Sequence, residues 1–384
     1  MKRISLVLAA ALAVSCTCNQ IIQGPDLPDP IGEKVARMTL REKVGQLFCV
    51  RPEAFDVALE WESYEDLANN NLQAVTPQML RVNRDYPVGG IILFAHNIAD
   101  EPQLDSLVRQ LKSFNGDPLL YIDEEGGRVA RIANNPSFRV EKFTSMGAIG
   151  KTGDLRQAYD CGKTIGTYLK RYGFDVDLAP VADVNTNPSN PVIGTRAFSP
   201  DPEIASKMVV AYLQGLKESG IAGCVKHFPG HGDTRTDTHF GYAQSGKTWE
   251  EMLACELLPF KAAIERDVPL VMTAHIACPA VTGSSVPATL SPVLLTEKLR
   301  GELGFGGVII TDGMAMGAIT RQYKPGQAAL MSLQAGADII LGPKNFTEAF
   351  DAVMDAVQVD STLTEERIDE SVVRILRLKE RVRR

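Results

Sequence analysis

The sequence has little that would bind a polyanion or cross a membrane. Among its 384 residues there is no block of lysines and arginines, and the formal net charge is −7. A nucleic-acid-binding protein needs a basic face for phosphate contacts, so this composition argues against that class. The clearest apolar run, residues 4–14, is too short to span a bilayer as a helix. The charged share of 23% and the hydrophobic share of 45% are those of an ordinary globular protein.

Cysteine and tryptophan are also few or unsuitably spaced for several common functions. The cysteines of the chain body have no short spacing such as Cys-x-x-Cys, so neither a zinc knuckle nor a disulfide framework is indicated. Trp61 and Trp249 are too few to form an aromatic platform for sugars. No Gly-x-Gly-x-x-Gly follows an early strand, which argues against a dinucleotide-binding fold. We expect the body cysteines to be core packing residues: Cys49, Cys161, Cys224, Cys255 and Cys278.

The N-terminus predicts export. Two basic residues precede the short apolar run, which is typical of a signal peptide. The segment before Cys16 resembles a bacterial lipoprotein cleavage site, and Cys18 is the weaker candidate. We therefore expect a signal peptide over residues 1–15, an acylated Cys16, and a tether over residues 16–31. The expected location is the bacterial cell envelope, and an ordinary secretory signal is the alternative.

Residues 32–384 alternate between short runs rich in Val, Ile and Leu and longer segments of helical period. This alternation is typical of βα units around a parallel sheet, and eight parallel strands close a TIM barrel. The predicted strands are residues 45–50, 89–94, 119–123, 174–179, 223–227, 270–275, 308–311 and 338–341. We therefore predict an α/β protein with a single (β/α)8 TIM barrel over residues 32–384. A doubly wound open sheet is the alternative.

Local signals mark two of the helices. Residues 39–42, Thr-Leu-Arg-Glu, have the spacing of a capping box. Near the C-terminus Ile368, Val372, Ile375 and Leu376 form one apolar stripe. We expect both helices to cover the barrel.

Ionisable residues stand where predicted strands end. Asp123 ends the third strand, Lys226 and His227 end the fifth, His275 ends the sixth, and Asp312 follows the seventh. In a TIM barrel these ends share one face, which carries the active site. Charged groups there would be costly without partners or a pocket. We therefore expect these side chains to converge.

The segment after the fifth strand predicts an acid/base group. Residues 226–239, KHFPGHGDTRTDTH, contain three of the five histidines, and their glycines and prolines predict a loop. Asp237 precedes His239 by two positions, and a carboxylate bonded to one ring nitrogen raises the proton affinity of imidazole. Asp312, directly after an apolar strand, is a plausible nucleophile. Glycosidic bond cleavage needs both kinds of group.

Three segments resemble glycoside hydrolase family 3, in its bacterial β-N-acetylglucosaminidase (β-hexosaminidase) branch. They are residues 122–131 (IDEEGGRVAR), 192–198 (VIGTRAF) and 226–239, and the resemblance extends over about residues 32–380. It implies a retaining mechanism with Asp312 as nucleophile and His239, oriented by Asp237, as acid/base. It implies no metal and no organic cofactor.

The resemblance also implies how substrate is bound. The residues implied to hold the N-acetylglucosamine ring are Asp123, Arg131, Arg196, Lys226 and His227. The implied reaction releases terminal non-reducing β-N-acetylglucosamine, with peptidoglycan fragments or related oligosaccharides as substrates. We expect a carbohydrate as partner, no nucleic acid, contact with a membrane only through the lipid anchor, and a monomer by default.

The chain departs from the family pattern at two positions. Many relatives carry Asp where this chain has Gly313, and Gln or His where it has Glu124. The first departure leaves Asp312 in place, and the second could alter a neighbouring hydrogen bond. Larger β-glucosidases of the family add a second domain with a Glu acid/base, which does not follow the barrel in this sequence, so the histidine loop is expected to supply that group.

Alternatives remain at this point. A β-glucosidase or an N-acetylglucosaminide phosphorylase of the same family would share the pattern. A zinc amidohydrolase would use some of His227, His231, Asp237, His239 and Asp312, but the first strand lacks the His-x-His such enzymes need. A sugar-binding lipoprotein would need neither a nucleophile nor an acid/base.

Several polar residues have structural explanations. His231 is expected to brace its Gly-Pro loop rather than to react, and His275 either lines the pocket or packs in the core. Asp175, Asp177 and Asp183, which flank the fourth strand, are expected to be structural.

Overall fold

The structure is a computed structural model that describes residues 29–56, 72–234 and 243–383. Eight parallel strands lie side by side in the order β11-β9-β7-β6-β3-β2-β1-β12. A parallel bridge between Ile310 and Ile339 links the two edge strands and so nearly closes the barrel. The strands are β1 (Phe48–Val50), β2 (Gly90–Leu93), β3 (Leu119–Ile122), β6 (Val176–Asp177), β7 (Ala222–Phe228), β9 (Leu270–Thr273), β11 (Val308–Ile310) and β12 (Ile340–Leu341). The predicted TIM barrel is confirmed.

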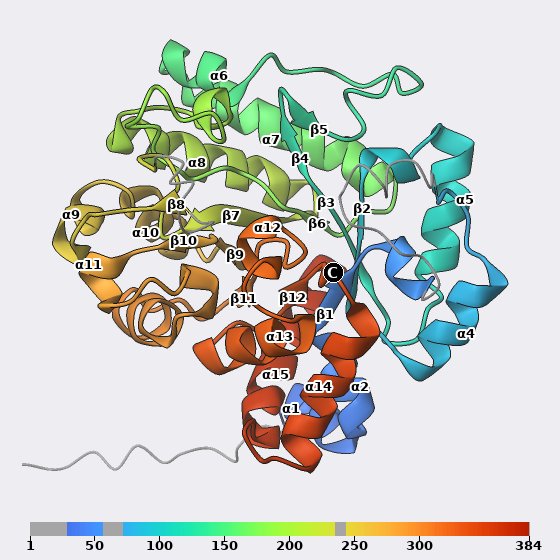
Figure 1. Cartoon of the computed structure of the whole chain (residues 1–384). Helices are drawn as coiled ribbons and strands as arrows, with labels where there is room; N and C mark the ends of the chain where they lie inside the picture. Colours follow the sequence, from blue (N-terminus) through green and yellow to red (C-terminus); the bar gives the residue numbers. More distant parts are fainter. Residues whose placement is uncertain (1–28, 57–71, 235–242, 384) are drawn as a thin grey trace, which may run out of the picture.

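Helices surround the strands (Figure 1). The larger ones are α1 (Pro30–Arg37), α2 (Leu40–Gln46), α4 (Pro77–Asp85), α5 (Glu101–Leu111), α6 (Met146–Thr152), α7 (Leu155–Arg171), α8 (Pro202–Glu218), α9 (Trp249–Ala254), α10 (Leu258–Ile264), the π-helical η5 (Val293–Glu302), α13 (Pro325–Ala335), α14 (Phe346–Gln358) and α15 (Glu365–Arg383). Shorter ones are η1 (Pro52–Phe55), η2 (Ala95–Asn97), η3 (Gly194–Arg196), α11 (Pro279–Thr282), η4 (Ala288–Leu290) and α12 (Gly317–Thr320).

The capping box at the start of α2 forms as predicted. The backbone N–H of Thr39 donates to the Glu42 carboxylate at 2.7 Å, and the Glu42 N–H donates to the Thr39 hydroxyl at 3.3 Å. The helix started in this way runs to Gln46. The first strand therefore begins at Phe48, and the predicted start at residue 45 was wrong.

Two short strand pairs lie outside the barrel and were not predicted. One is an antiparallel pair of β4 (Glu124–Gly126) with β5 (Val129–Ala130), directly after β3. The other is a parallel pair of β8 (Ala243–Gln244) with β10 (Ile276–Ala277). Both follow barrel strands at their carboxyl ends, so they extend the chain on the face where the polar residues converge.

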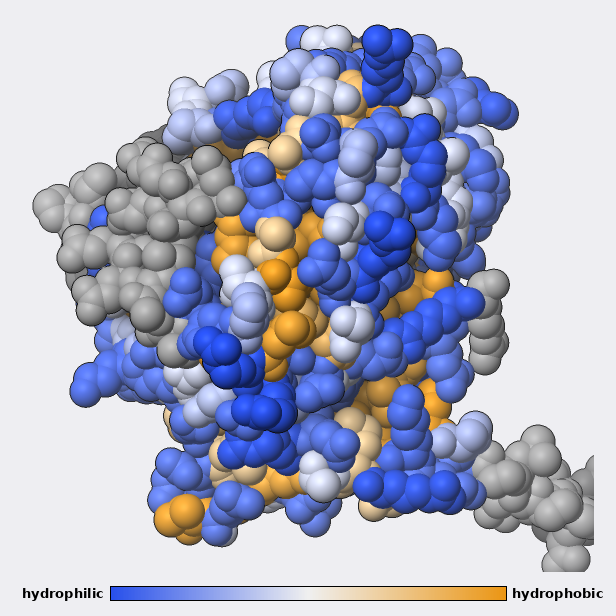
Figure 2. All heavy atoms as spheres, turned by 90° about the vertical axis from the view of Figure 1, so that its right-hand side faces the viewer, coloured by the Kyte–Doolittle hydropathy of each residue, from blue (hydrophilic) through white to orange (hydrophobic). Residues whose placement is uncertain are grey.

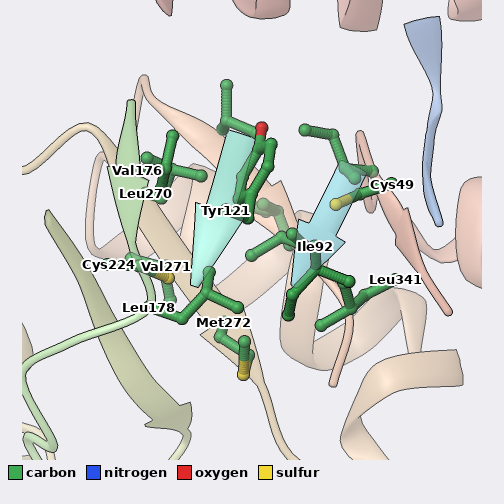
Figure 3. Packing of buried hydrophobic residues seen from close by; sticks show 14 of the residues in the cluster. Cys49, Ile92, Tyr121, Val176, Leu178, Cys224, Leu270, Val271, Met272 and Leu341 are labelled. Atoms are coloured by element: carbon green, nitrogen blue, oxygen red, sulfur yellow. The ribbon is translucent and has the colours of Figure 1, made fainter. Parts of the chain in front are cut away.

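The barrel interior is filled by apolar side chains. Figure 3 shows Tyr121, Cys49 and Cys224 packed among aliphatic residues of several strands, and all three are fully buried. Cys161 and Cys278 are buried free thiols, as expected of core packing residues, whereas Cys255 is only half-buried. The sheet is thus packed on both faces, as a parallel barrel requires.

The C-terminal helix α15 ties together the amino ends of the strands. Its predicted apolar stripe is buried, from Ile368 to Leu376. Lys379 donates to the carbonyl oxygens of Gly116 at 2.9 Å and Asp117 at 2.6 Å, just before β3. Arg381 pairs with Asp267 at 2.9 Å, before β9. These contacts leave the opposite, carboxyl face of the barrel open for the site.

The outer surface is mainly polar. Figure 2 shows hydrophilic residues over most of one face, with smaller apolar areas between them. Within the described residues no helix combines the length and the apolar character needed to cross a bilayer.

Candidate active site

A cavity of about 430 Å³ lies at the carboxyl ends of the barrel strands. All six predicted site residues within the described chain line it: Asp123, Arg131, Arg196, Lys226, His227 and Asp312. The cavity is therefore the place at which the predicted residues converge. Asp237 and His239 lie outside the described residues, as does Cys16, so their expected roles stay predictions.

A larger groove lies elsewhere and is less suited to catalysis. It has a volume of about 1170 Å³ and runs along α8 and the end of α10. Its described lining includes Tyr159, Lys207, Val210 and Asp267 but none of the predicted site residues. Size alone does not mark an active site, and the smaller cavity contains the convergent ionisable groups.

A buried ion-pair network forms one wall of the cavity. Lys226, from β7, places its Nζ atom 2.7 Å from Asp123 Oδ1 and 2.6 Å from Glu125 Oε1. Arg196, from η3, binds both oxygens of Glu125, at 2.7 and 2.8 Å. Arg131 Nη2 approaches Asp123 Oδ2 at 3.4 Å. Three cations thus share two carboxylates, and the wall can donate hydrogen bonds to sugar hydroxyls.

The network keeps its carboxylates ionised. Burial by itself raises the pKa of Glu125, but the charges of Lys226 and Arg196 outweigh burial and lower this pKa to about 2. Burial likewise raises the pKa of Asp123, but the charge of Lys226 lowers it, and the net result is a pKa below the ordinary value. The pKa of Lys226 is lowered by burial but raised more by its two carboxylate partners. The wall therefore remains charged across the neutral pH range.

A second carboxylate, Asp183, orients His227. Its Oδ2 atom lies 2.7 Å from His227 Nδ1, and its Oδ1 atom accepts the backbone N–H of His231 at 2.6 Å. Because a carboxylate accepts, Nδ1 carries the proton and the bare Nε2 faces Arg196 Nη2 at 3.4 Å. Asp183 was expected to be structural. Asp183 follows β6, and the same strand-end rule that identified Asp123 and Asp312 could therefore have identified it as a residue of the site.

Asp312 is held ionised at the end of β11. Its Oδ1 atom accepts the backbone N–H of Gly313 at 2.7 Å. Burial raises the pKa of Asp312, but His275, His227, this N–H and Lys226 together lower it below its ordinary value. An ionised carboxylate on the cavity wall is what a nucleophile at an anomeric carbon requires.

Glu124 supports the backbone that carries Arg131. Its carboxylate accepts the backbone N–H groups of Arg131, Ile132 and Ala133 at 2.5, 2.9 and 2.8 Å. The hydroxyl of Tyr168 donates to the same group at 2.8 Å. Glu124, one of the two positions at which a departure from the family pattern was noted, therefore accepts hydrogen bonds at both carboxylate oxygens behind the cavity.

His231 braces the chain where the histidine loop begins. Its Nδ1 atom lies 2.7 Å from the hydroxyl of Thr234, and Asn190 donates to its carbonyl oxygen at 2.8 Å. This is the bracing contact that the sequence predicts. His231 also lines the cavity.

Comparison with known proteins identifies the family. The family model for the glycosyl hydrolase family 3 N terminal domain matches residues 39–378. The chain belongs to glycoside hydrolase family 3. The match covers the whole barrel, including every described residue of the cavity wall.

The relatives of this family 3 chain bear consistent names. The β-hexosaminidase A of Pseudoalteromonas piscicida is 35% identical over 335 residues, which are 80% of this chain and 56% of that protein. The β-hexosaminidase of Tolumonas auensis is 36% identical over 276 residues, 71% of this chain and 80% of that protein. The chain thus spans little more than half of the first relative and most of the second.

Solved structures of family 3 enzymes have the same fold. The β-N-acetylglucosaminidase from Paenibacillus sp. str. FPU-7 matches with a TM-score of 0.78 and 37% identity, over 90% of this chain and 63% of that one. NagZ from Neisseria gonorrhoeae, in complex with N-trifluoroacetyl-D-glucosamine, matches with a TM-score of 0.67 and 28% identity, over 79% of this chain and 87% of that one.

Proposed function

We propose that this family 3 chain is a retaining glycoside hydrolase that releases terminal non-reducing β-N-acetylglucosamine from oligosaccharides. The observation that carries the proposal is the position of Asp312, at the end of β11, in a cavity shared with the Asp123–Lys226–Glu125–Arg196 network. The names of the relatives, β-hexosaminidase and β-N-acetylglucosaminidase, support the choice of sugar.

In the proposed mechanism Asp312 attacks the anomeric carbon while the bond to the leaving oxygen breaks. His239, held by Asp237, gives its proton to that oxygen, so the aglycone leaves as an alcohol. In the second step His239 takes a proton from water, and the water oxygen displaces Asp312 from the sugar. The two inversions retain the β configuration. Neither step consumes a cofactor.

The cavity wall would hold the sugar during both steps. Asp123 can accept a hydrogen bond from a ring hydroxyl, and Lys226 and Arg196 can donate to hydroxyl oxygens. Lys226 contacts Asp123 and Glu125, and Arg196 contacts Glu125, each within 3 Å. These groups are therefore preorganised and lose little freedom when substrate binds. His227, whose Nε2 atom lies 3.4 Å from Arg196 Nη2, also lines the cavity. This division of donors and acceptors suits a polyhydroxylated ring.

Peptidoglycan fragments are the proposed natural substrate class. The described lining contains four cations (Arg51, Arg131, Arg196 and Lys226) and three carboxylates (Asp123, Glu125 and Asp312). Together these seven side chains carry a net charge of +1, which favours a glycan that carries a carboxylate. An acylated Cys16 would place the enzyme in the cell envelope, where such fragments arise.

The test compares aryl β-N-acetylglucosaminide with aryl β-glucoside, each with and without phosphate. We expect the N-acetylated substrate to be preferred and free N-acetylglucosamine to be the product. A phosphate-dependent sugar 1-phosphate would make the enzyme a phosphorylase, and preference for the glucoside would make it a β-glucosidase. Turnover of neither, with tight binding of N-acetylglucosamine, would indicate a sugar-binding lipoprotein.

A further inference from the structure

His275 is held by hydrogen bonds on both sides of its ring. It lies just after β9 and is buried. Its Nε2 atom is 3.0 Å from the carbonyl oxygen of Gly313, and its Nδ1 atom is 2.9 Å from the hydroxyl of Thr289. A carbonyl oxygen can only accept, so Nε2 carries the proton. Burial also lowers the pKa of His275, with Asp312 opposing this in part, which favours a neutral ring with a bare Nδ1.

Two buried threonines lie on the Nδ1 side of the ring. The Thr289 hydroxyl lies 2.7 Å from the Thr273 hydroxyl, and its single proton can go to the Ala274 carbonyl oxygen at 3.0 Å or to His275 Nδ1 at 2.9 Å. The Ala274 carbonyl oxygen already accepts the Thr289 N–H at 3.3 Å, whereas a neutral Nδ1 is satisfied only if the hydroxyl proton points to the ring. Thr273 then donates to Thr289. The chain of donors therefore runs from Thr273 through Thr289 and His275 to Gly313, and a buried polar group left out of it would be costly.

The last acceptor in this series of hydrogen bonds, the Gly313 carbonyl oxygen, belongs to the residue that follows the proposed nucleophile. Gly313 follows Asp312, and its N–H donates to Asp312 Oδ1 at 2.7 Å. Its carbonyl oxygen also accepts the N–H of Met316 at 3.0 Å. Residue 313 has no side chain that could restrain this turn, and glycine has more backbone freedom to lose than any other residue. The turn is therefore held by contacts at the Gly313 carbonyl oxygen, together with the N–H of Met314, which donates to the Leu341 carbonyl oxygen at 2.8 Å.

We propose that His275 is a positioning residue for Asp312. By fixing the Gly313 carbonyl oxygen, His275 holds the Gly313 N–H, and this N–H orients the Asp312 carboxylate toward the anomeric carbon. His275 itself touches neither substrate nor the reacting atoms. The inference rests on the proposed function, because it requires Asp312 to be the nucleophile.

The test measures formation of the covalent glycosyl-enzyme in the full-length protein. A fluorinated N-acetylglucosaminyl fluoride, whose good leaving group needs little protonation, traps this intermediate. The kinetics of inactivation by this reagent give two constants: Ki measures its binding, and ki measures the step that forms the covalent bond. The variants are His275→Asn, His275→Gln and Thr289→Val. The amide of glutamine reaches about as far as Nε2 and can still donate to Gly313, whereas that of asparagine reaches only about as far as Nδ1.

We expect His275→Asn to lower ki by about 10- to 100-fold and to change Ki by less than about 3-fold. A misoriented nucleophile raises the energy of the transition state for bond formation but leaves binding of the reagent unchanged. His275→Gln should restore most of ki. Thr289→Val keeps the imidazole and removes the hydroxyl hydrogen-bonded to Nδ1, so it should lower ki several-fold. If His275→Asn does not fold, Thr289→Val serves as the test variant in its place.

Two results would overturn the inference. One is trapping of His275→Asn, or of Thr289→Val if the asparagine variant does not fold, at the wild-type rate. The other is equal loss of ki in the glutamine and asparagine variants together with equal loss of thermal stability, as expected of a purely structural histidine. Failure of the proposed function looks different, because the wild type itself would then not be trapped.

Discussion

Replacement of Glu125 by glutamine tests the charge network beneath the substrate. Glu125 is 1% exposed and accepts three hydrogen bonds from Lys226 and Arg196. Its pKa falls from the ordinary 4.5 to about 2. At about 1.4 kcal/mol for each pKa unit, this corresponds to about 3 kcal/mol of stability at pH 7. Breaking a buried ion pair by removing one partner costs about 3–5 kcal/mol, so the two estimates agree.

The sign of the pH dependence follows from the lowered pKa. The Glu125 carboxylate binds its proton less readily in the folded than in the unfolded chain, so it stabilises the fold above pH 4.5 and loses this effect as the pH falls toward 2. Glu125→Gln should therefore be less stable than the wild type by about 3 kcal/mol at pH 7 and by only about 1 kcal/mol at pH 3.

Urea unfolding of both proteins at pH 7, 4 and 3, followed by circular dichroism, measures this difference. Glu297→Gln, an exposed glutamate on η5, is the matched control and should change stability by less than about 0.5 kcal/mol. A difference at pH 7 that is no larger than that of the control, or one that does not narrow between pH 7 and pH 3, would refute the reasoning. Loss of N-acetylglucosamine binding should accompany the loss of stability, since Lys226 and Arg196 lose their common partner.

Three further predictions concern the site. Glu124→Gln should raise KM about 5- to 30-fold, because an amide accepts at only one of its two ends and one or two hydrogen bonds of about 1 kcal/mol each are lost; unchanged KM would show that the Arg131 backbone does not depend on Glu124. Asp183→Asn should lower kcat/KM at least about 10-fold, because an amide can donate to His227 Nδ1 and favour the other tautomer; a wild-type value would mean that this tautomer is unimportant. His239→Ala should slow alkyl glycosides far more than nitrophenyl glycosides in steady-state assays, because only poor leaving groups need a proton; equal losses would argue against the acid role.

The barrel could be predicted from the sequence because each strand carries its own signal. Short apolar runs bounded by turn residues mark all eight strands, and the Thr39–Glu42 capping box marks α2. The β4–β5 pair was missed because Glu124–Ala130 is charged and Gly-rich and shows no strand period. The strand boundaries depend on where neighbouring helices end, as at Gln46 and Phe48, and local patterns do not specify this.

The site could be predicted in part, for a related reason. The strand-end rule and the family resemblance identify residues one at a time, and Asp123, Lys226, His227 and Asp312 indeed converge. The hydrogen-bond and ion-pair partners of these residues, in contrast, are determined only when the chain folds. Glu125 meets Arg196 from 71 positions away, and Asp183 meets His227 from 44 positions away. No local spacing relates such residues, so Glu125 was expected at the end of the third strand but given no role in the site, and Asp183 was assigned a structural role.

The most direct test of the account is identification of the residue that carries the sugar. The wild type and Asp312→Asn are treated with the fluorinated N-acetylglucosaminyl fluoride, digested, and analysed by peptide mass spectrometry, and turnover of an aryl β-N-acetylglucosaminide is measured in parallel. We expect a glycosyl adduct on Asp312 in the wild type, and no adduct and almost no turnover in a folded Asp312→Asn. An adduct on another residue, or near-normal turnover by Asp312→Asn, would contradict it.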